Sequence, residues 1–282
     1  MKKFKSVIII SLSLLFSLGF LSSQAQKSVS LRYKLHEGKS FLTTSTIDQD
    51  IEMHMQGQVM TINQSITSDE TVHIAKVDTK TIKTSQSIDK MTMKQSMAGQ
   101  EFFYDSSDPT TYASGRGAQL GAAFNKLIKK TFSITIDKLG NIQSFDLANL
   151  TGPDGKVSDN VSSGNNFIIF PEKKVKPNDS WEADIKPLKG SKTKIHMKYT
   201  LLKLSGKKAT IGLEGTITSN EEAGDNVPKI DGSLSGEATV DLRTGWTMES
   251  NMDQEIKMEV NQNGMTIPMT ISSTVTKKSK AK

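Results

Sequence analysis

Strict alternation of apolar and polar side chains over unusually long segments is the feature that most constrains how this chain can fold. Between residues 246 and 260 the even positions are mostly apolar, and the odd positions are all polar. A period of two places successive side chains on opposite faces of an extended strand. Such segments exceed the usual strand length, and long strands coil. The pattern therefore predicts a large antiparallel sheet with one apolar face and one wet face.

The longest alternating stretch occurs twice in the chain. Residues 45–68 align with residues 250–273 without a gap, and both copies contain a turn signal with glycine. The identical pairs include Asp48/Asp253, Gln49/Gln254, Ile51/Ile256 and Met53/Met258. A duplicated hairpin explains this match, either as two related lobes or as one pseudo-symmetric sheet. The alternative is that two amphipathic hairpins have converged on similar residues.

One segment departs from the strand pattern. Within residues 117–130, Leu120, Phe124, Leu127 and Ile128 recur at helical spacing. A helix of this kind needs an apolar surface to cover, and the concave side of a curved sheet offers one. We therefore expect a mainly β (α+β) fold. It would be a large curved antiparallel sheet or half-barrel with pseudo-duplicated hairpins and one main helix packed on the concave face.

The two ends of the chain suggest the domain organisation. Residues 1–25 combine three lysines, an apolar run and a small-residue cleavage site, which is typical of a signal peptide; an uncleaved anchor is the alternative. Residues 26–276 then form a single β-rich domain. Its two related halves (about 26–106 and 178–276) are joined by a helix-containing segment (107–177). The basic tail, residues 277–282, is expected to be a frayed and solvated end.

Composition narrows the class of protein further. The chain has no cysteine, which excludes disulfides, thiolate metal sites, a cysteine nucleophile and a lipid-modified cysteine. We therefore expect an exported protein, periplasmic or secreted, that is soluble and not a lipoprotein. No transmembrane segment is expected after signal cleavage. Basic and acidic residues are interspersed, so the electrostatic footprint of a nucleic-acid-binding protein is missing.

No motif in the sequence predicts catalysis. The segment Gly115–Gly121 resembles a glycine-rich phosphate loop, but it lacks the spacing and the preceding parallel strand. The four histidines have no zinc-ligand spacing, and no serine lies in a GxSxG motif. We expect no enzyme activity, no cofactor and no metal site. A hydrolase with an unrecognised site remains a third hypothesis, which requires ionisable groups that converge in a cleft.

Methionine is the one compositional oddity. The chain has 13 methionines, and most of them fall on the apolar parity of their strands. Methionine is flexible and polarizable, so it suits a surface that accepts varied apolar ligands. The candidate ligand-binding residues are Met53, Met55, Met258, Met265 and Met269. An ordinary methionine-padded core is the structural alternative. A thioether site for Cu(I) is a third interpretation, suggested by Met53-x-Met55 and Met91-x-Met93-x-x-x-Met97.

Glutamines share this parity with the methionines. Gln49, Gln64, Gln95 and Gln254 would all point to the same inward face, together with Ser250. Buried amides need hydrogen-bonding partners, so an ordinary core would contain fewer of them. The combination indicates a partly polar concave surface.

Two segments carry a resemblance to a known family. FSITIDKLGNIQSF (Phe132–Phe145) and FPEKKVKPNDSWEA (Phe170–Ala183), with the signal peptide, resemble an uncharacterised family of exported bacterial β-rich proteins, a domain of unknown function. The resemblance implies no activity and no catalytic residues. The expected architecture is also similar to the half-barrel of periplasmic lipoprotein carriers, which is a likeness of fold alone.

These observations lead to a functional hypothesis. We expect a non-enzymatic envelope protein that binds a lipid or another apolar small molecule in a methionine-rich cavity. The alternative is a structural or protein-interaction module that binds an envelope protein through open sheet edges or through the loops 104–117 and 151–166.

Overall fold

The computed structural model describes residues 28–55, 57–146, 167–185, 193–219, 228–262 and 265–282. The expected signal peptide, the loop 151–166 and the turn at Asn263-Gly264 lie outside these residues. In the described part of the chain, no helix is both long and apolar enough to cross a membrane.

The described residues form one twelve-stranded sheet and two short helices. The strands are β1 (Ser40–Met55), β2 (Gln58–Val77), β3 (Thr81–Met97), β4 (Gln100–Asp105), β5 (Thr131–Asp137), β6 (Ile142–Asp146), β7 (Ser180–Ile185), β8 (Thr193–Ser205), β9 (Lys208–Ser219), β10 (Lys229–Asp241), β11 (Thr247–Gln262) and β12 (Met265–Ala281). The helices are the 3-10 helix η1 (Pro109–Tyr112) and the α-helix α1 (Gly115–Phe124).

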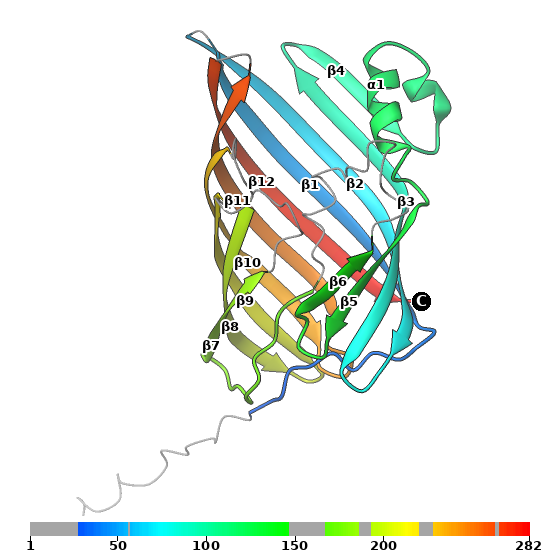
Figure 1. The fold of residues 1–282 in the computed structure, drawn as a ribbon, viewed down its shortest axis with the longest axis vertical. Coiled ribbons are helices and arrows are strands. Elements are labelled where there is room, and N and C mark those ends of the chain that lie inside the picture. The colour runs from blue at the N-terminus through cyan, green and yellow to red at the C-terminus, as the bar shows by residue number, and fades with distance from the viewer. Residues whose placement is uncertain (1–27, 56, 147–166, 186–192, 220–227, 263–264) are drawn as a thin grey trace, which may run out of the picture.

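The sheet is antiparallel and follows the order β6-β5-β3-β2-β1-β12-β11-β10-β9-β8-β7, with β4 paired to β3. The first and last long strands therefore meet at its centre, where Phe41 pairs with Ala281 and Met53 pairs with Met269. Figure 1 shows the sheet curling into a half-barrel. The half-barrel expected from the strand lengths is confirmed.

The prediction of one main helix on the concave face is wrong. Helix α1 has only ten residues and lies at one corner of the molecule beside β4 and η1 (Figure 1). It ends at Phe124, and the chain then leaves the helix, with Lys129 donating a backbone hydrogen bond to Ile88 in β3 (2.7 Å). The apolar positions beyond Phe124 that suggested a longer helix instead follow the edge of the sheet.

The prediction of a frayed basic tail is also wrong. Strand β12 continues to Ala281 and pairs with β1 along this stretch, while Lys277 and Lys278 also pair with β11. The chain end is ordered because it fills a central position in the sheet, where both neighbouring strands supply hydrogen-bonding partners.

The lower end of the half-barrel in Figure 1 is closed by a plug, which we define as residues 28–39 and 167–175. Val29 and Val175 join its two segments by a β-bridge, with backbone hydrogen bonds of 2.8 and 2.9 Å. The plug packs against residues from both sides of the sheet in one hydrophobic core. Its own buried members are Leu31, Tyr33, Leu35, Phe167, Ile168, Ile169, Phe170 and Val175. Apolar burial of this kind supplies most of the stability of a chain without disulfides.

Backbone hydrogen bonds tie the plug to turns on opposite sides of the sheet. Tyr33 N donates to Lys138 O in the β5–β6 turn (2.9 Å), and Lys34 N donates to Thr244 O in the β10–β11 turn (2.8 Å). Gly140 and Gly245 stand at these two contacts with φ of +97° and +75°. A Cβ on Gly245 would lie 2.4 Å from the carbonyl oxygen of Arg32. Only glycine combines this backbone conformation with such a close approach.

Candidate ligand-binding face

The inner face of the sheet is the one that packs on the plug. In β1 it carries Phe41, Ser45, Ile47, Ile51 and Met53, because alternate residues of a strand share a face. Phe41 is buried against the plug, where its ring stacks on Trp246 with centroids 4.1 Å apart. The residues nearer the far end of the strand rise away from the plug. They form the upper half of the inner face, and the site is built there.

Cross-strand pairing arranges these residues in rows that run across the strands. One row contains isoleucine on four neighbouring strands, in the order Ile62, Ile51, Ile271 and Ile256. The next row toward the strand tips contains methionine on the same four strands, in the order Met60, Met53, Met269 and Met258. Directly opposed side chains on neighbouring strands are close enough to touch. The two rows therefore form one continuous apolar surface.

A row of polar side chains lies on the other side of the isoleucine row. We call it the amide row, and it consists of Gln95, Gln64, Gln49, Ser273 and Gln254 on β3, β2, β1, β12 and β11. Gln95 Nε2 donates a hydrogen bond to Gln64 Oε1 (3.2 Å). Below it, toward the plug, lies another apolar row with Met93, Ile66, Ile47, Val275 and Met252. The inner face thus has an uncharged polar band between apolar ones.

Exposure distinguishes this part of the inner face from the base, by which we mean the end of the half-barrel that the plug closes. Phe41 and Val72, which lie beside the plug, are 5% and 0% exposed. The isoleucine, methionine and amide rows are instead all partly exposed. A close-packed interior would bury apolar side chains of this size, as the base does. The upper inner face is therefore an apolar surface within reach of solvent.

Among the described residues, the inner face becomes charged only near the end that the plug closes. Lys277 pairs with Ser45 on one side and Ser250 on the other, which places its side chain on the inner face below Val275. Burial lowers the pKa of the Lys277 ammonium, and the carboxylate of Glu70 acts in the opposite direction. Lys277 was expected in the solvated tail and therefore not on this face. The alternation Ile271, Ser273, Val275 continues to Lys277 and was the signal that could have found it.

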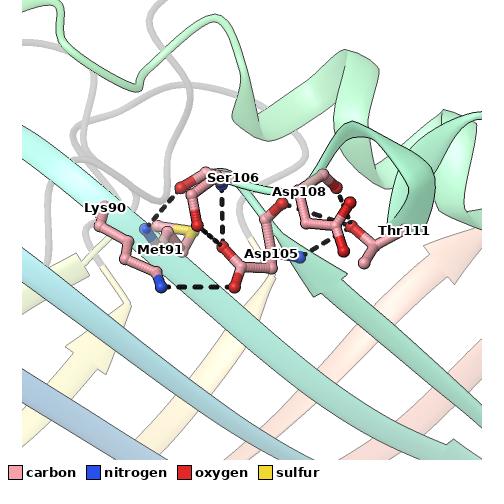
Figure 2. Close-up of polar contacts among 7 residues, drawn as sticks. Lys90, Met91, Asp105, Ser106, Asp108 and Thr111 are labelled. Atoms are coloured by element: carbon pink, nitrogen blue, oxygen red, sulfur yellow. Dashed lines mark hydrogen bonds and ion pairs between the residues drawn. The ribbon is translucent and has the colours of Figure 1, made fainter.

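A polar network holds the corner where β4 joins this face (Figure 2). Lys90 Nζ lies 3.3 Å from Asp105 Oδ2, and the Ser106 hydroxyl accepts a hydrogen bond from the backbone of Met91 (2.9 Å). The Thr111 hydroxyl accepts from the backbone of Asp105 (3.0 Å). Hydrogen bonds from Ser107 lower the pKa of the Asp105 carboxyl, and Lys90 adds to this effect.

The same corner contains a small aromatic cluster that anchors α1. The Tyr104 ring lies 5.5 Å from the ring of Tyr112 and 5.5 Å from that of Phe124, measured between centroids. Its hydroxyl donates to Asn125 Oδ1 (2.7 Å), and burial raises the pKa of Tyr104 to about 12. Because β4 is fixed in this way, Phe102 is held opposite Gln95 at the end of the amide row.

A separate groove of about 1180 Å³ crosses the sheet from β4 to β10. Its lining includes the five residues of the amide row and Phe102 as well as their sequence neighbours of outward parity. We assign it to the outer face, because most of the lining residues have outward parity and neither the isoleucines nor Leu234 of the inner face belongs to it. The outward lining residues are Asp48, Asp50, Asn63, Ser65, Lys94, Ser96, Glu101, Phe103, Ser233, Ser235, Asp253, Glu255, Ser272 and Thr274. Several of their polar groups bond to one another, as in Asn63 to Asp50 (2.6 Å) and Thr274 to Asp253 (2.7 Å). This polar groove offers little to an apolar ligand.

The structure brings three of the five predicted ligand-binding methionines together. Met53, Met269 and Met258 lie in one row on adjacent strands, with Met60 beside them. Met55 and Met265 lie nearer the strand tips and are 42% and 49% exposed. None of the five lines the outer groove, and Met55 lines a smaller pocket of about 630 Å³ at the tips of β2 and β3. Their role in binding a ligand remains a prediction.

The other candidate motifs have plain structural roles. The glycine-rich segment Gly115–Gly121 lies within α1. All four histidines are exposed, as the polar parity of His54, His73 and His196 predicted for those three. His196 lies 2.7 Å from Asp184, between Nδ1 and Oδ1, on the outer face of β7 and β8. Among the described residues, no group of three or more His, Cys, Asp or Glu side chains could hold a metal ion.

Comparison with known proteins confirms the resemblance to an uncharacterised family. The model described as "Family of unknown function (DUF6263)" matches residues 160–247. This range includes the quoted segment Phe170–Ala183 but not Phe132–Phe145. A search of curated proteins found no match.

A solved structure has a similar fold. A lipovitellin structure, titled for its lipid–protein interactions, has a TM-score of 0.54 at 10% sequence identity. The match covers 87% of this chain and 25% of that one, so this chain spans about a quarter of the lipovitellin length. An outer membrane channel from Pseudomonas putida F1 (TM-score 0.26, 7% identity, 88% and 97% covered) is more distant. So is the autotransporter NalP translocator domain from Neisseria meningitidis (0.24, 6%, 87% and 90%).

Proposed function

We propose that this chain is an exported, non-enzymatic envelope protein that binds a lipid or another apolar small molecule on the upper inner face of its half-barrel. One observation carries the proposal. The isoleucine and methionine rows present eight apolar side chains on four neighbouring strands, and all eight are partly exposed. Contiguous apolar surface that a protein leaves uncovered usually marks a binding site.

The physical reasons for this choice lie in the two rows. Burial of apolar surface contributes about 25 cal/mol per Å² removed from water, so an acyl chain laid across them would be held without any charged contact. Methionine side chains adapt to ligands of varied shape. The lipovitellin likeness is one of fold, and its title's reference to lipids makes a lipid the first ligand to test.

The first experiment examines the protein as it is made in a bacterial envelope. The full chain is purified without detergent and examined by native mass spectrometry, followed by solvent extraction and lipid analysis. We expect a bound species with the mass of a lipid. Repeated recovery of ligand-free protein that also fails to take up added lipid would instead favour a structural or protein-interaction module.

A pair of variants then locates the site. Ile271→Gln places an amide in the centre of the isoleucine row, and we expect it to weaken binding of an apolar fluorescent probe about tenfold, because it removes apolar contact surface. Ser272→Gln puts the same side chain at the next, exposed position on the outer face and serves as the control. Equal affinities for the two variants would place the binding site elsewhere.

A further inference from the structure

We infer that the molecule bound on the inner face carries an uncharged polar group, an ester, amide or hydroxyl, at the level of the amide row. A neutral glycerolipid such as a diacylglycerol has this chemistry and no charge, whereas a fatty-acid anion and the headgroup of an anionic phospholipid are charged. The inference rests on the proposed function and specifies the class of ligand that the site selects.

The amide row has hydrogen-bonding capacity to spare. Within the described part of the chain, the side-chain amides of Gln49 and Gln254 make no hydrogen bond to another protein group, and Gln64 and Gln95 bond only to each other. A primary amide has two donor hydrogens and an acceptor oxygen. The row can therefore donate to ester carbonyls and accept from a hydroxyl at several adjacent points.

The surroundings of the row favour a neutral partner. On the inner face of β1, β2, β11 and β12, the described residues from the Ile47 level to the methionine row include no Asp, Glu, Lys, Arg or His. A charged headgroup placed there would lose water without gaining an opposite charge, which is costly. The first charges below this level are Lys277 and Glu70, beyond the row that contains Ile47 and Val275.

The outer face at the same level has the opposite character. Residues adjacent to the amide row in sequence, such as Asp48, Asp50, Asp253 and Glu255, are charged, and alternation along the strand places them on the other side of the sheet. The uncharged inner face is therefore not a consequence of a charge-poor segment. Charge is present at this level and is confined to the outside.

The spacing of the rows fits an ester-linked lipid. Consecutive inner-face residues on one strand are two positions apart, so the isoleucine row lies about 7 Å from the amide row and the methionine row about 13 Å from it. A diacylglycerol places its ester groups and hydroxyl next to its acyl chains over a comparable distance. The esters would meet the amide row while the chains cover the isoleucine and methionine rows.

The test compares ligands and variants in equilibrium binding measurements on the full chain. The ligands are dioctanoylglycerol, decanoate and the apolar fluorophore N-phenyl-naphthylamine. The variants are Gln49→Leu and Gln254→Leu, with Gln143→Leu on exposed β6 as the matched control. We expect the unaltered protein to prefer dioctanoylglycerol to decanoate. Each inner-face variant should weaken dioctanoylglycerol about fivefold, the effect of one hydrogen bond, while fluorophore binding stays the same or strengthens.

The outcomes separate this inference from the proposed function. The fluorophore and both lipids could bind while the two inner-face variants leave the affinity for dioctanoylglycerol unchanged. The amide row then does not bind the polar group of the ligand, and the inference is overturned. A preference for decanoate over dioctanoylglycerol would overturn it as well. If none of the three ligands binds, the proposed function itself fails.

Discussion

At the scale of single residues, the fold depends on a few close contacts where the plug meets the sheet. Tyr33 is one of these residues. Its buried hydroxyl donates to the Ile168 carbonyl (3.2 Å) and accepts from the Ile168 N–H (2.9 Å). These two hydrogen bonds replace the ones that the hydroxyl would make to water. Burial holds the pKa of Tyr33 well above its ordinary value. No pattern in the sequence distinguishes this tyrosine, because its partners lie far away in the chain.

Substitution of Tyr33 by phenylalanine tests this contact. Tyr33→Phe leaves the buried N–H and carbonyl of Ile168 without that hydroxyl, so we expect a loss of about 1–3 kcal/mol in the free energy of unfolding. Urea titration followed by tryptophan fluorescence measures it. A change below about 0.5 kcal/mol would show that the hydroxyl contributes nothing to closure of the base.

Gly245 provides a second test at this scale, with an internal control. Gly245→Ala imposes a positive φ on alanine and also a clash with the Arg32 carbonyl. Gly206→Ala imposes a positive φ of +58° with nothing within 4 Å. The conformational strain alone costs about 1–3 kcal/mol, so the Gly206 variant should lose about that much and the Gly245 variant more. Equal urea midpoints for the two variants would contradict the contact with the plug.

At the scale of elements, the corner formed by β4, η1 and α1 is the part that local patterns described least well. Apolar residues at helical spacing predicted a helix to residue 130, but the helix ends at Phe124 and its apolar neighbours pack on the edge of the sheet. The corner depends on Asp105, which bonds to Ser107 (2.6 Å from its hydroxyl) and lies near Lys90. Beyond Phe124, backbone pairing of Ile128 with Ile88 in β3 overrode the helical period.

The stability of this corner should depend on pH through Asp105. The folded-state pKa of Asp105 is lowered, so its contribution is fully present above the ordinary pKa and is lost as pH falls through the lowered value. We expect amide hydrogen exchange in α1 to accelerate below about pH 4 in the unaltered protein, once corrected for intrinsic rates. Asp105→Asn should exchange faster already at neutral pH and lose most of this dependence. Asp78→Asn, in the β2–β3 turn, is the control, and a matching pH profile in Asp105→Asn would reject the role of this carboxylate.

At the scale of the whole molecule, alternation in the sequence predicted the faces of the sheet well. Residues 247–262 and 265–281 are strands as expected, and Ile267 is buried. The register between distant strands could not be predicted, because it depends on which strands become neighbours. Ile51 and its repeat partner Ile256 do share a row through Ile271. Ile62 belongs to the same row, because it pairs with Ile51. The residue of β12 in this row is Ile271, however, and not Ile267, which corresponds to Ile62 in the repeat.

Alternation in the sequence therefore predicted which residues of the candidate site point inward, but not how they are arranged on the inner face. The glutamines and methionines were expected on one face, and pairing sorted them into separate rows. The plug, which decides where the inner face is buried and where it is open, has no short-range signature. It forms because residues 28–39 and 167–175, far apart in the chain, meet at one end of the sheet.

We propose an upper inner face that is open in the free protein and covered by a lipid in the complex. Because the chain has no cysteine, single cysteines can be introduced by Ile51→Cys on the inner face and Asp50→Cys on the outer face and labelled with a maleimide. We expect both cysteines to react in the free protein, and saturating dioctanoylglycerol to slow labelling only in the Ile51 variant. Protection of the Asp50 variant instead, or no protection of either, would contradict it.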